Sequence, residues 1–219
     1  MSWRVANACA ERKFGSATRK QIIVFLADTV PLIDRDEVNA NLLHVTEELS
    51  VESPAALGRY RPDVVYYVNR LPLVVIKAKC QNSSSADKSM ILECISQHNR
   101  NQKDLDIQGI YAYSQVLMSI SGTDARYGTT NTPKKFWGSW NEEEITEAQM
   151  QEIKSTPLSN DQKSALFADK PKWAKDDFER LHSGLVLLTE QDLMIISLLR
   201  PDRLLDFTRR FIFFDRGNK

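Results

Sequence analysis

The 219-residue sequence is poor in residues that build disulfide or zinc frameworks, and it has no net charge. Its three cysteines, Cys9, Cys80 and Cys94, are isolated and odd in number, which excludes a typical disulfide framework or Cys-x-x-Cys site. The 29 basic and 29 acidic side chains cancel, so no overall basic field indicates nucleic-acid binding. No apolar run is long enough to span a membrane, and the first residues lack a signal peptide's apolar core. We therefore expect a cytoplasmic protein that does not enter a membrane.

The clearest positive feature is a pair of apolar runs, Val64–Val68 and Leu71–Ile76, separated by Asn69 and Arg70. Both runs are rich in β-branched and aromatic residues, which predicts two strands joined by a tight turn. Neither run alternates cleanly between polar and apolar residues. Both faces of the hairpin are therefore expected to be covered, as in the central strands of a layered α/β domain.

Charged residues stand at the open end of this hairpin. Side chains alternate across a strand, so Asp63 shares a face with Val65, while Lys77 and Lys79 share a face with Val75. One turn brings the three charged positions together. A Pro-Asp before one strand and a Lys closing the next is the arrangement of nucleases of the PD-(D/E)xK class, and here the (D/E) position is Lys77.

Several ordered motifs resemble one family within that class, the N-terminal nuclease domain of type I restriction enzyme R subunits. They are Arg61-Pro62-Asp63-Val64-Val65, Leu71-Pro72-Leu73-Val74-Val75-Ile76 with Lys79, Tyr113-Ser114-Gln115-Val116-Leu117, Gly122 to Thr129, Phe136-Trp137 with Trp140, and Leu204-Leu205-Asp206-Phe207 before Phe211-Ile212-Phe213-Phe214. The resemblance covers roughly Glu47 to the C-terminus. It implies a restriction-endonuclease-like mixed central β-sheet flanked by helices, with residues 1–140 as the nuclease core, residues 1–42 as its helical N-terminal part, and residues 141–219 as a mainly helical extension.

The resemblance also implies chemistry: Mg²⁺-dependent cleavage of double-stranded DNA. In the family an Asp and a Glu hold the ion and a Lys assists the attacking water or stabilises negative charge, roles that fall here on Asp63, Lys77 and Lys79. Lys77 has the wrong charge for its position. Three interpretations stay open: a catalytically disabled chain, replacement of the missing ligand by Glu47 or Glu48, or a lysine that merely extends its ammonium into water.

Further residues are candidates for DNA contact. The family carries a Gln-x-x-x-Tyr pair on the next helix; Gln97 matches the first position, and Asn101 stands at the second. Residues 59–103 contain eight basic and three acidic residues, a local excess of five positive charges that attracts phosphates. The DNA-binding candidates are Arg59, Arg61, Lys88 and Arg100. The histidines, His44, His98 and His182, show no metal-binding spacing and are interpreted as structural or surface residues.

The remaining pattern predicts the other elements. A helix over residues 16–28, a further helix from Asp36 to Asn41, a strand from Leu43 to Val51, a helix from Asp87 to Lys103, and strands at Gln115–Ile120 and Arg126–Thr129 are expected. Glu142, Glu143 and Glu144 are interpreted as the first turns of a helix. The last third favours helices at 161–168, 175–181, 190–199 and 202–207, followed by a strand at Phe211–Phe214.

The family resemblance places partners outside this chain. No Gly-x-x-x-x-Gly-Lys-Ser/Thr loop occurs, so ATP is expected to bind only in a motor region that this sequence does not include. The expected partners are double-stranded DNA and the methyltransferase and specificity subunits of a restriction-modification complex. The alternatives are a catalytically inactive DNA-binding or docking module with the same fold, and an unrelated mixed α/β protein whose hairpin mimics the pattern.

Overall fold

The computed structural model describes residues 32–53, 59–79, 87–103, 106–122, 124–141, 143–182 and 187–212. The chain divides into two compact units, residues 1–34 and 35–219, and the described helices and strands belong to the second. The helix predicted at 16–28, and the cysteines Cys9 and Cys80, lie outside the described residues.

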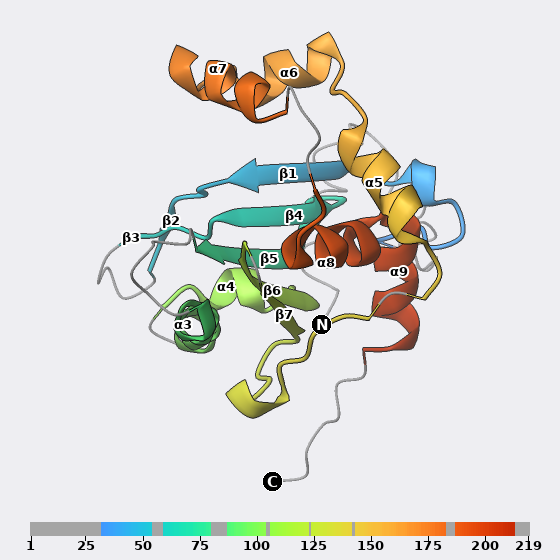
Figure 1. The fold of residues 1–219 in the computed structure, drawn as a ribbon. Helices are drawn as coiled ribbons and strands as arrows, with labels where there is room; N and C mark the ends of the chain where they lie inside the picture. The colour runs from blue at the N-terminus through green and yellow to red at the C-terminus, as the bar shows by residue number, and fades with distance from the viewer. Residues whose placement is uncertain are drawn as a thin grey trace, which may run out of the picture. The chain divides into compact units, whose positions relative to one another are not determined.

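A five-stranded mixed sheet forms the centre of the second unit (Figure 1). Its strands, in spatial order, are β1 (Leu43–Glu47), β4 (Val64–Val68), β5 (Leu71–Lys79), β6 (Val116–Ser121) and β7 (Ala125–Gly128). Strands β5 and β6 run parallel and the other neighbours run antiparallel. The predicted mixed sheet and its hairpin are confirmed.

The strand predicted from Leu43 to Val51 is instead broken in two. Strand β1 ends at Glu47, and Val51–Glu52 forms β2, which pairs with β3 (Arg59–Tyr60) in a separate two-stranded sheet. Glu48 has a φ of 47°, a left-handed conformation that no regular strand contains. The apolar pattern gave no sign of this break. Before β1, the expected helix is only a 3₁₀ turn, η1 (Val38–Ala40).

The turn between β4 and β5 and a bulge beyond it together set the register of the hairpin. Asn69 and Arg70 have φ values of 50° and 71°, the pair of positive angles that a two-residue type I′ turn requires. The turn places Val68 opposite Leu71 and Tyr67 opposite Pro72. A one-residue register shift between Tyr66 and Tyr67 then places Val64 opposite Ile76. This register places Asp63, the residue before β4, opposite Lys77.

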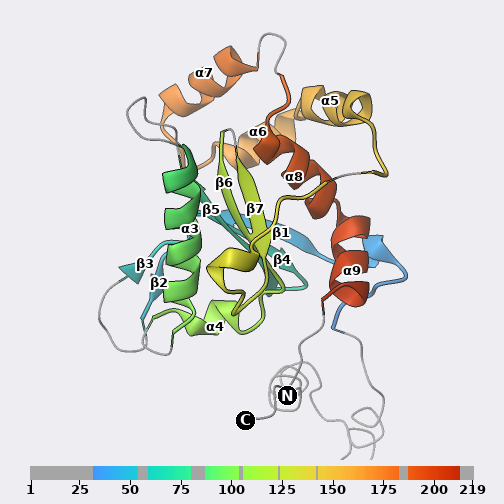
Figure 2. The ribbon, with the colours of Figure 1, turned by 60° about the horizontal axis from the view of Figure 1, so that its bottom comes forward.

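Helix α3 (Asp87–Asn101) lies along one face of the sheet, over β5 and β6 (Figure 2). Its Ile91 and Ile95 are buried in one cluster with Val65, Val75 and Leu117, and the short helix α4 (Gln108–Tyr111) adds Tyr111. Burial of Met90, Ile91, Cys94 and Ile95 confirms the predicted core face of α3.

The last third is helical, as expected. It contains α5 (Glu147–Ser155), α6 (Asn160–Leu166), α7 (Lys172–Leu181), α8 (Glu190–Leu199) and α9 (Pro201–Arg210). On the sheet face opposite α3, the Tyr127 ring of β7 packs against Phe207 of α9 at a centroid distance of 6.0 Å. Helices therefore cover both faces of the sheet.

Two expectations for this region were wrong. Thr146 caps α5 through a capping box with Gln149, so the helix begins at Glu147, and Glu143 and Glu144 precede it. Phe211 does not begin a strand: it lies in the turn after α9, its ring stacked on Phe207 at 5.8 Å, while residues 213 and 214 lie outside the described part. None of the helices that the structure describes is both long and apolar enough to cross a membrane.

His98 ties α3 to the sheet. It is fully buried; its Nε2 lies 2.9 Å from the Met118 carbonyl oxygen, its Nδ1 lies 3.1 Å from the Tyr111 hydroxyl, and its ring stacks on Trp137. Burial lowers the pKa of His98 to about 4, so the neutral imidazole is the folded form. His98 is thus structural, as the sequence indicated.

We predict that His98 makes the fold acid-sensitive. In the unfolded chain this histidine protonates near its ordinary pKa of about 6.5, so the unfolded state binds more protons below that pH and stability falls between about pH 6.5 and 4. The contribution lost is on the order of 3 kcal/mol. Urea unfolding at a series of pH values should show a shallower decline for His98→Phe; equal slopes in both proteins would contradict the prediction.

Candidate active site

The site is built on the open end of the β4–β5 hairpin, where Asp63 and Lys77 meet across the two strands. Lys77 Nζ lies 3.1 Å from Asp63 Oδ1 and donates a second hydrogen bond of 2.7 Å to the Arg61 carbonyl oxygen. The Ala78 amide donates to Asp63 Oδ2 at 2.7 Å. The Lys77 side chain is only 10% exposed. Both carboxylate oxygens of Asp63 are therefore engaged by donors from β5.

Lys79 lies two residues farther along β5 and contacts the helix above it. Its Nζ lies 3.2 Å from Glu93 Oε1 of α3, and the same oxygen accepts a hydrogen bond of 3.0 Å from Gln97 Nε2. Glu93 thus joins two of the predicted site residues. Sequence reasoning counted Glu93 only as a charge, although its position four residues before Gln97 places both on one helical face.

The two candidate substitute carboxylates, Glu47 and Glu48, flank Asp63 at the end of β1. The Glu48 amide donates to the Asp63 carbonyl oxygen at 2.8 Å, but its carboxylate pairs with Arg61 at 2.7 Å. Glu47 forms an ion pair with Lys170. Among the described residues, no group of three or more His, Cys, Asp or Glu side chains is placed to hold a metal ion.

The other predicted DNA contacts are only partly described. Arg61 is exposed beside the site, and Arg100 is exposed on α3, where its Nε donates to Asn101 at 3.4 Å. The side chains of Arg59 and Lys88 lie outside the described part. Cys94 is buried on α3, and burial raises the pKa of its thiol to about 11, so it is an inert core residue.

Comparison with known proteins identifies the family to which this chain belongs. Residues 18–136 match the family model described as the type I restriction enzyme R protein N terminus. The chain belongs to this family. The matched region includes the whole β4–β5 hairpin, α3 and the five strands of the sheet, so it contains the Asp63–Lys77 pair and Lys79.

Two curated relatives support the family assignment. The chain is 31% identical over 101 residues to the putative type I restriction enzyme MjaIXP endonuclease subunit of Methanocaldococcus jannaschii, an alignment covering 46% of this chain and 9% of the relative. It is 25% identical over 191 residues to the type I restriction enzyme HindI endonuclease subunit of Haemophilus influenzae, covering 87% of this chain and 14% of the relative. The chain therefore spans only a small part of each relative's length.

The residues present do not fit the Mg²⁺ ion that the family implies. A magnesium site needs hard oxygen ligands in near-octahedral geometry. Here Asp63 is the one carboxylate of the motif, and an ammonium 3.1 Å from it stands at the position of the second. Glu47, Glu48 and Glu93 each carry a basic partner of their own.

We predict that Asp63 and Lys77 are energetically coupled. Asp63→Asn leaves a nearly buried ammonium without its carboxylate and should lower the free energy of unfolding by roughly 1–3 kcal/mol. Adding Lys77→Met should recover most of that loss, which urea unfolding of the four proteins in the cycle would measure. As a control, Arg61→Gln removes an exposed pair and should cost at most about 1 kcal/mol. Additive effects at positions 63 and 77 would contradict the coupling.

Proposed function

We propose that this chain is the nuclease-type domain of a type I restriction R subunit, that it acts on double-stranded DNA, and that Lys77 impairs its phosphodiester cleavage. The observation that carries the proposal is the contact between the Lys77 ammonium and the Asp63 carboxylate. The family membership supplies the class of reaction. The contact explains why the reaction should be slow in this chain.

Hydrolysis of a phosphodiester in this class depends on a divalent ion that polarises the phosphate and helps ionise water. An ammonium about 4 Å from a divalent ion, at an effective dielectric constant near 20, is repelled by about 8 kcal/mol before relaxation. The Lys77 ammonium also satisfies Asp63 without any ion. Asp63 would be the remaining ligand, Lys79 the residue that stabilises negative charge, and Gln97 a residue that positions the strand or the water.

The wider assembly follows from the family. In this proposal the chain works as part of a longer polypeptide that couples ATP use to DNA movement, beside methyltransferase and specificity subunits that recognise the sequence. Mg²⁺ would bind this chain weakly. ATP would bind only in the motor region.

A second candidate function is a non-catalytic DNA-binding or docking module with the same fold. The same ion pair favours it, because Lys77 and Asp63 form a self-sufficient pair with no need of metal, and Lys79 is likewise paired with Glu93. In that case DNA binding would survive loss of Asp63, and no substitution at position 77 alone would produce cleavage.

We predict that Lys77→Glu converts the chain into a metal-dependent nuclease. The substitution removes the ammonium and adds a second carboxylate beside Asp63, so Mg²⁺ or Mn²⁺ affinity should rise at least 100-fold, equivalent to about 3 kcal/mol. Isothermal titration with each metal and nicking of supercoiled plasmid would measure the two effects.

Lys77→Gln is the matched control, because it removes the same charge without supplying a ligand and should stay inactive. Asp63→Asn in the Lys77→Glu protein should abolish the gained cleavage. If folded Lys77→Glu protein neither binds metal nor cuts DNA, the proposed active site is wrong. Unaltered DNA binding in that protein would then favour the docking module.

A further inference from the structure

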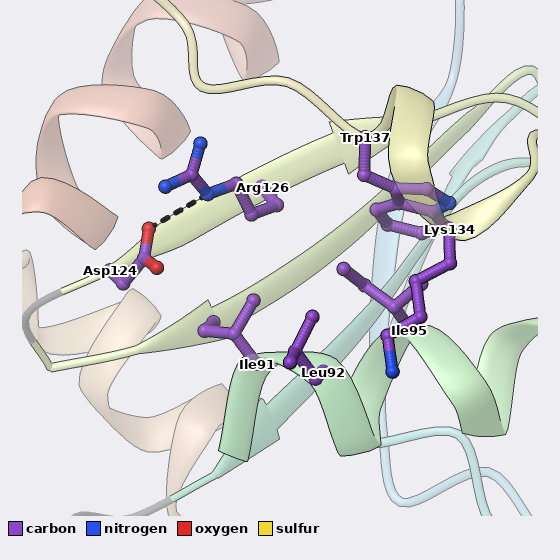
Figure 3. A pocket seen from close by; sticks show the side chains of 7 residues that line it. All are labelled: Ile91, Leu92, Ile95, Asp124, Arg126, Lys134 and Trp137. Atoms are coloured by element: carbon purple, nitrogen blue, oxygen red, sulfur yellow. Dashed lines mark ion pairs between the residues drawn. The ribbon is translucent and has the colours of Figure 1, made fainter. Parts of the chain in front are cut away.

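A cavity lies beside the candidate active site. None of the residues given a catalytic or DNA-binding role above lines it. It has a volume of about 220 Å³ and is lined by Ile91, Leu92 and Ile95 of α3, by Asp124 and Arg126 at β7, and by Lys134 and Trp137. Figure 3 shows Arg126 and Asp124 on one side, Lys134 and Trp137 on the other, and the three α3 residues between them. Two basic side chains and one acidic one give the cavity a positive balance.

The strand register places this cavity in line with the candidate active site. Lys77 pairs with Ser119 of β6, and Ser119 pairs with Arg126 of β7, so the three residues form one row on the α3 face of the sheet. Adjacent strands are roughly 4.8 Å apart, so Arg126 starts roughly 10 Å from Lys77. Phosphates along one DNA strand are separated by about 3.4 Å of helix rise, so one strand spans both positions within a few nucleotides.

An ion pair with Asp124 orients the Arg126 side chain for binding an anion. Its Nε lies 3.1 Å from Asp124 Oδ1, while the side chain remains 37% exposed. That contact uses the inner nitrogen of the guanidinium and orients the group, and its terminal nitrogens are the donors that pair with phosphate oxygens. Asp124 therefore orients the Arg126 guanidinium through Nε and leaves the two terminal nitrogens to pair with an anion.

The opposite wall depends on a glycine. Trp137 is buried, and its indole ring lies so close to Gly128 of β7 that an added Cβ would stand 3.0 Å from it. Trp137 Nε1 also donates to the Thr132 carbonyl oxygen at 3.1 Å. These contacts hold the 3₁₀ turn η2 (Lys134–Phe136) against the cavity, and the exposed Lys134 extends from this turn along Ile95 toward α3 (Figure 3).

We propose that this cavity is a subsite for the DNA strand, in which Arg126 and Lys134 each contact a backbone phosphate a few nucleotides from the candidate active site. Leu92, 43% exposed at the rim, supplies apolar surface for the adjoining deoxyribose. The inference rests on the proposed action on DNA. It concerns binding, so it is separable from cleavage and from the metal.

Fluorescence anisotropy with a labelled duplex tests the proposal, in EDTA and over a series of salt concentrations. Arg126→Gln and Lys134→Gln should each raise Kd by about 3- to 10-fold and reduce the slope of log K against log salt by about 0.9, the value for one lost phosphate contact. Lys135→Gln is the matched control, since Lys135 lies in the same turn with its ammonium over the Phe136 ring, 4.8 Å from the centroid. It should leave Kd within twofold.

Unchanged affinity and salt slope in both cavity variants would overturn the subsite. Displacement of the duplex by micromolar AMP or inorganic phosphate would also overturn it, because the cavity would then be a site for small anions. If Arg126→Gln does not fold, Lys134→Gln decides alone, since the Lys134 side chain is exposed. Failure of Lys77→Glu to cut DNA, with the cavity variants still weakening binding, would reject the nuclease and keep the subsite.

Discussion

The register between β4 and β5 is the constraint on which the site depends. A two-residue turn at Asn69 and Arg70, followed by a one-residue shift between Tyr66 and Tyr67, sets that register and brings Asp63 and Lys77 into contact. Without the shift, Asp63 would lie opposite Ile76. The parallel pairing of β5 with β6 extends the same row to Ser119, and β7 extends it to Arg126.

The contact sets the charge balance at the open end of the hairpin. Two carboxylates placed side by side on buried strands repel each other, and a divalent cation offsets that repulsion. With a lysine at position 77 the strands carry their own cation, which also donates a hydrogen bond to the Arg61 carbonyl oxygen. The hairpin end therefore balances the Asp63 charge with a residue of its own. The Lys77 ammonium and the Ala78 amide together engage both carboxylate oxygens of Asp63.

Helix α3 connects the site to the rest of the core. Its inner face packs on Val65, Val75 and Leu117, and its next positions carry Glu93 and Gln97 over Lys79. One turn of the same helix lines the cavity through Leu92 and Ile95. One helix therefore supplies residues to both the candidate active site and the cavity.

The sequence by itself determined the hairpin, the core face of α3, the helical last third and the family, because each of these depends on local periodicity or on short ordered motifs. It also marked Asp63, Lys77 and Lys79 as one group, since their order and spacing resemble a family motif. The one-residue register shift that places Asp63 opposite Lys77 was visible only in the structure. Only the tertiary structure decided that Glu48 breaks the first strand, that Glu93 holds Lys79, and that Arg126 shares a row with Lys77. Such contacts depend on the pairing of strands and the packing of a helix that lie far apart in the chain, and local patterns carry no record of that register.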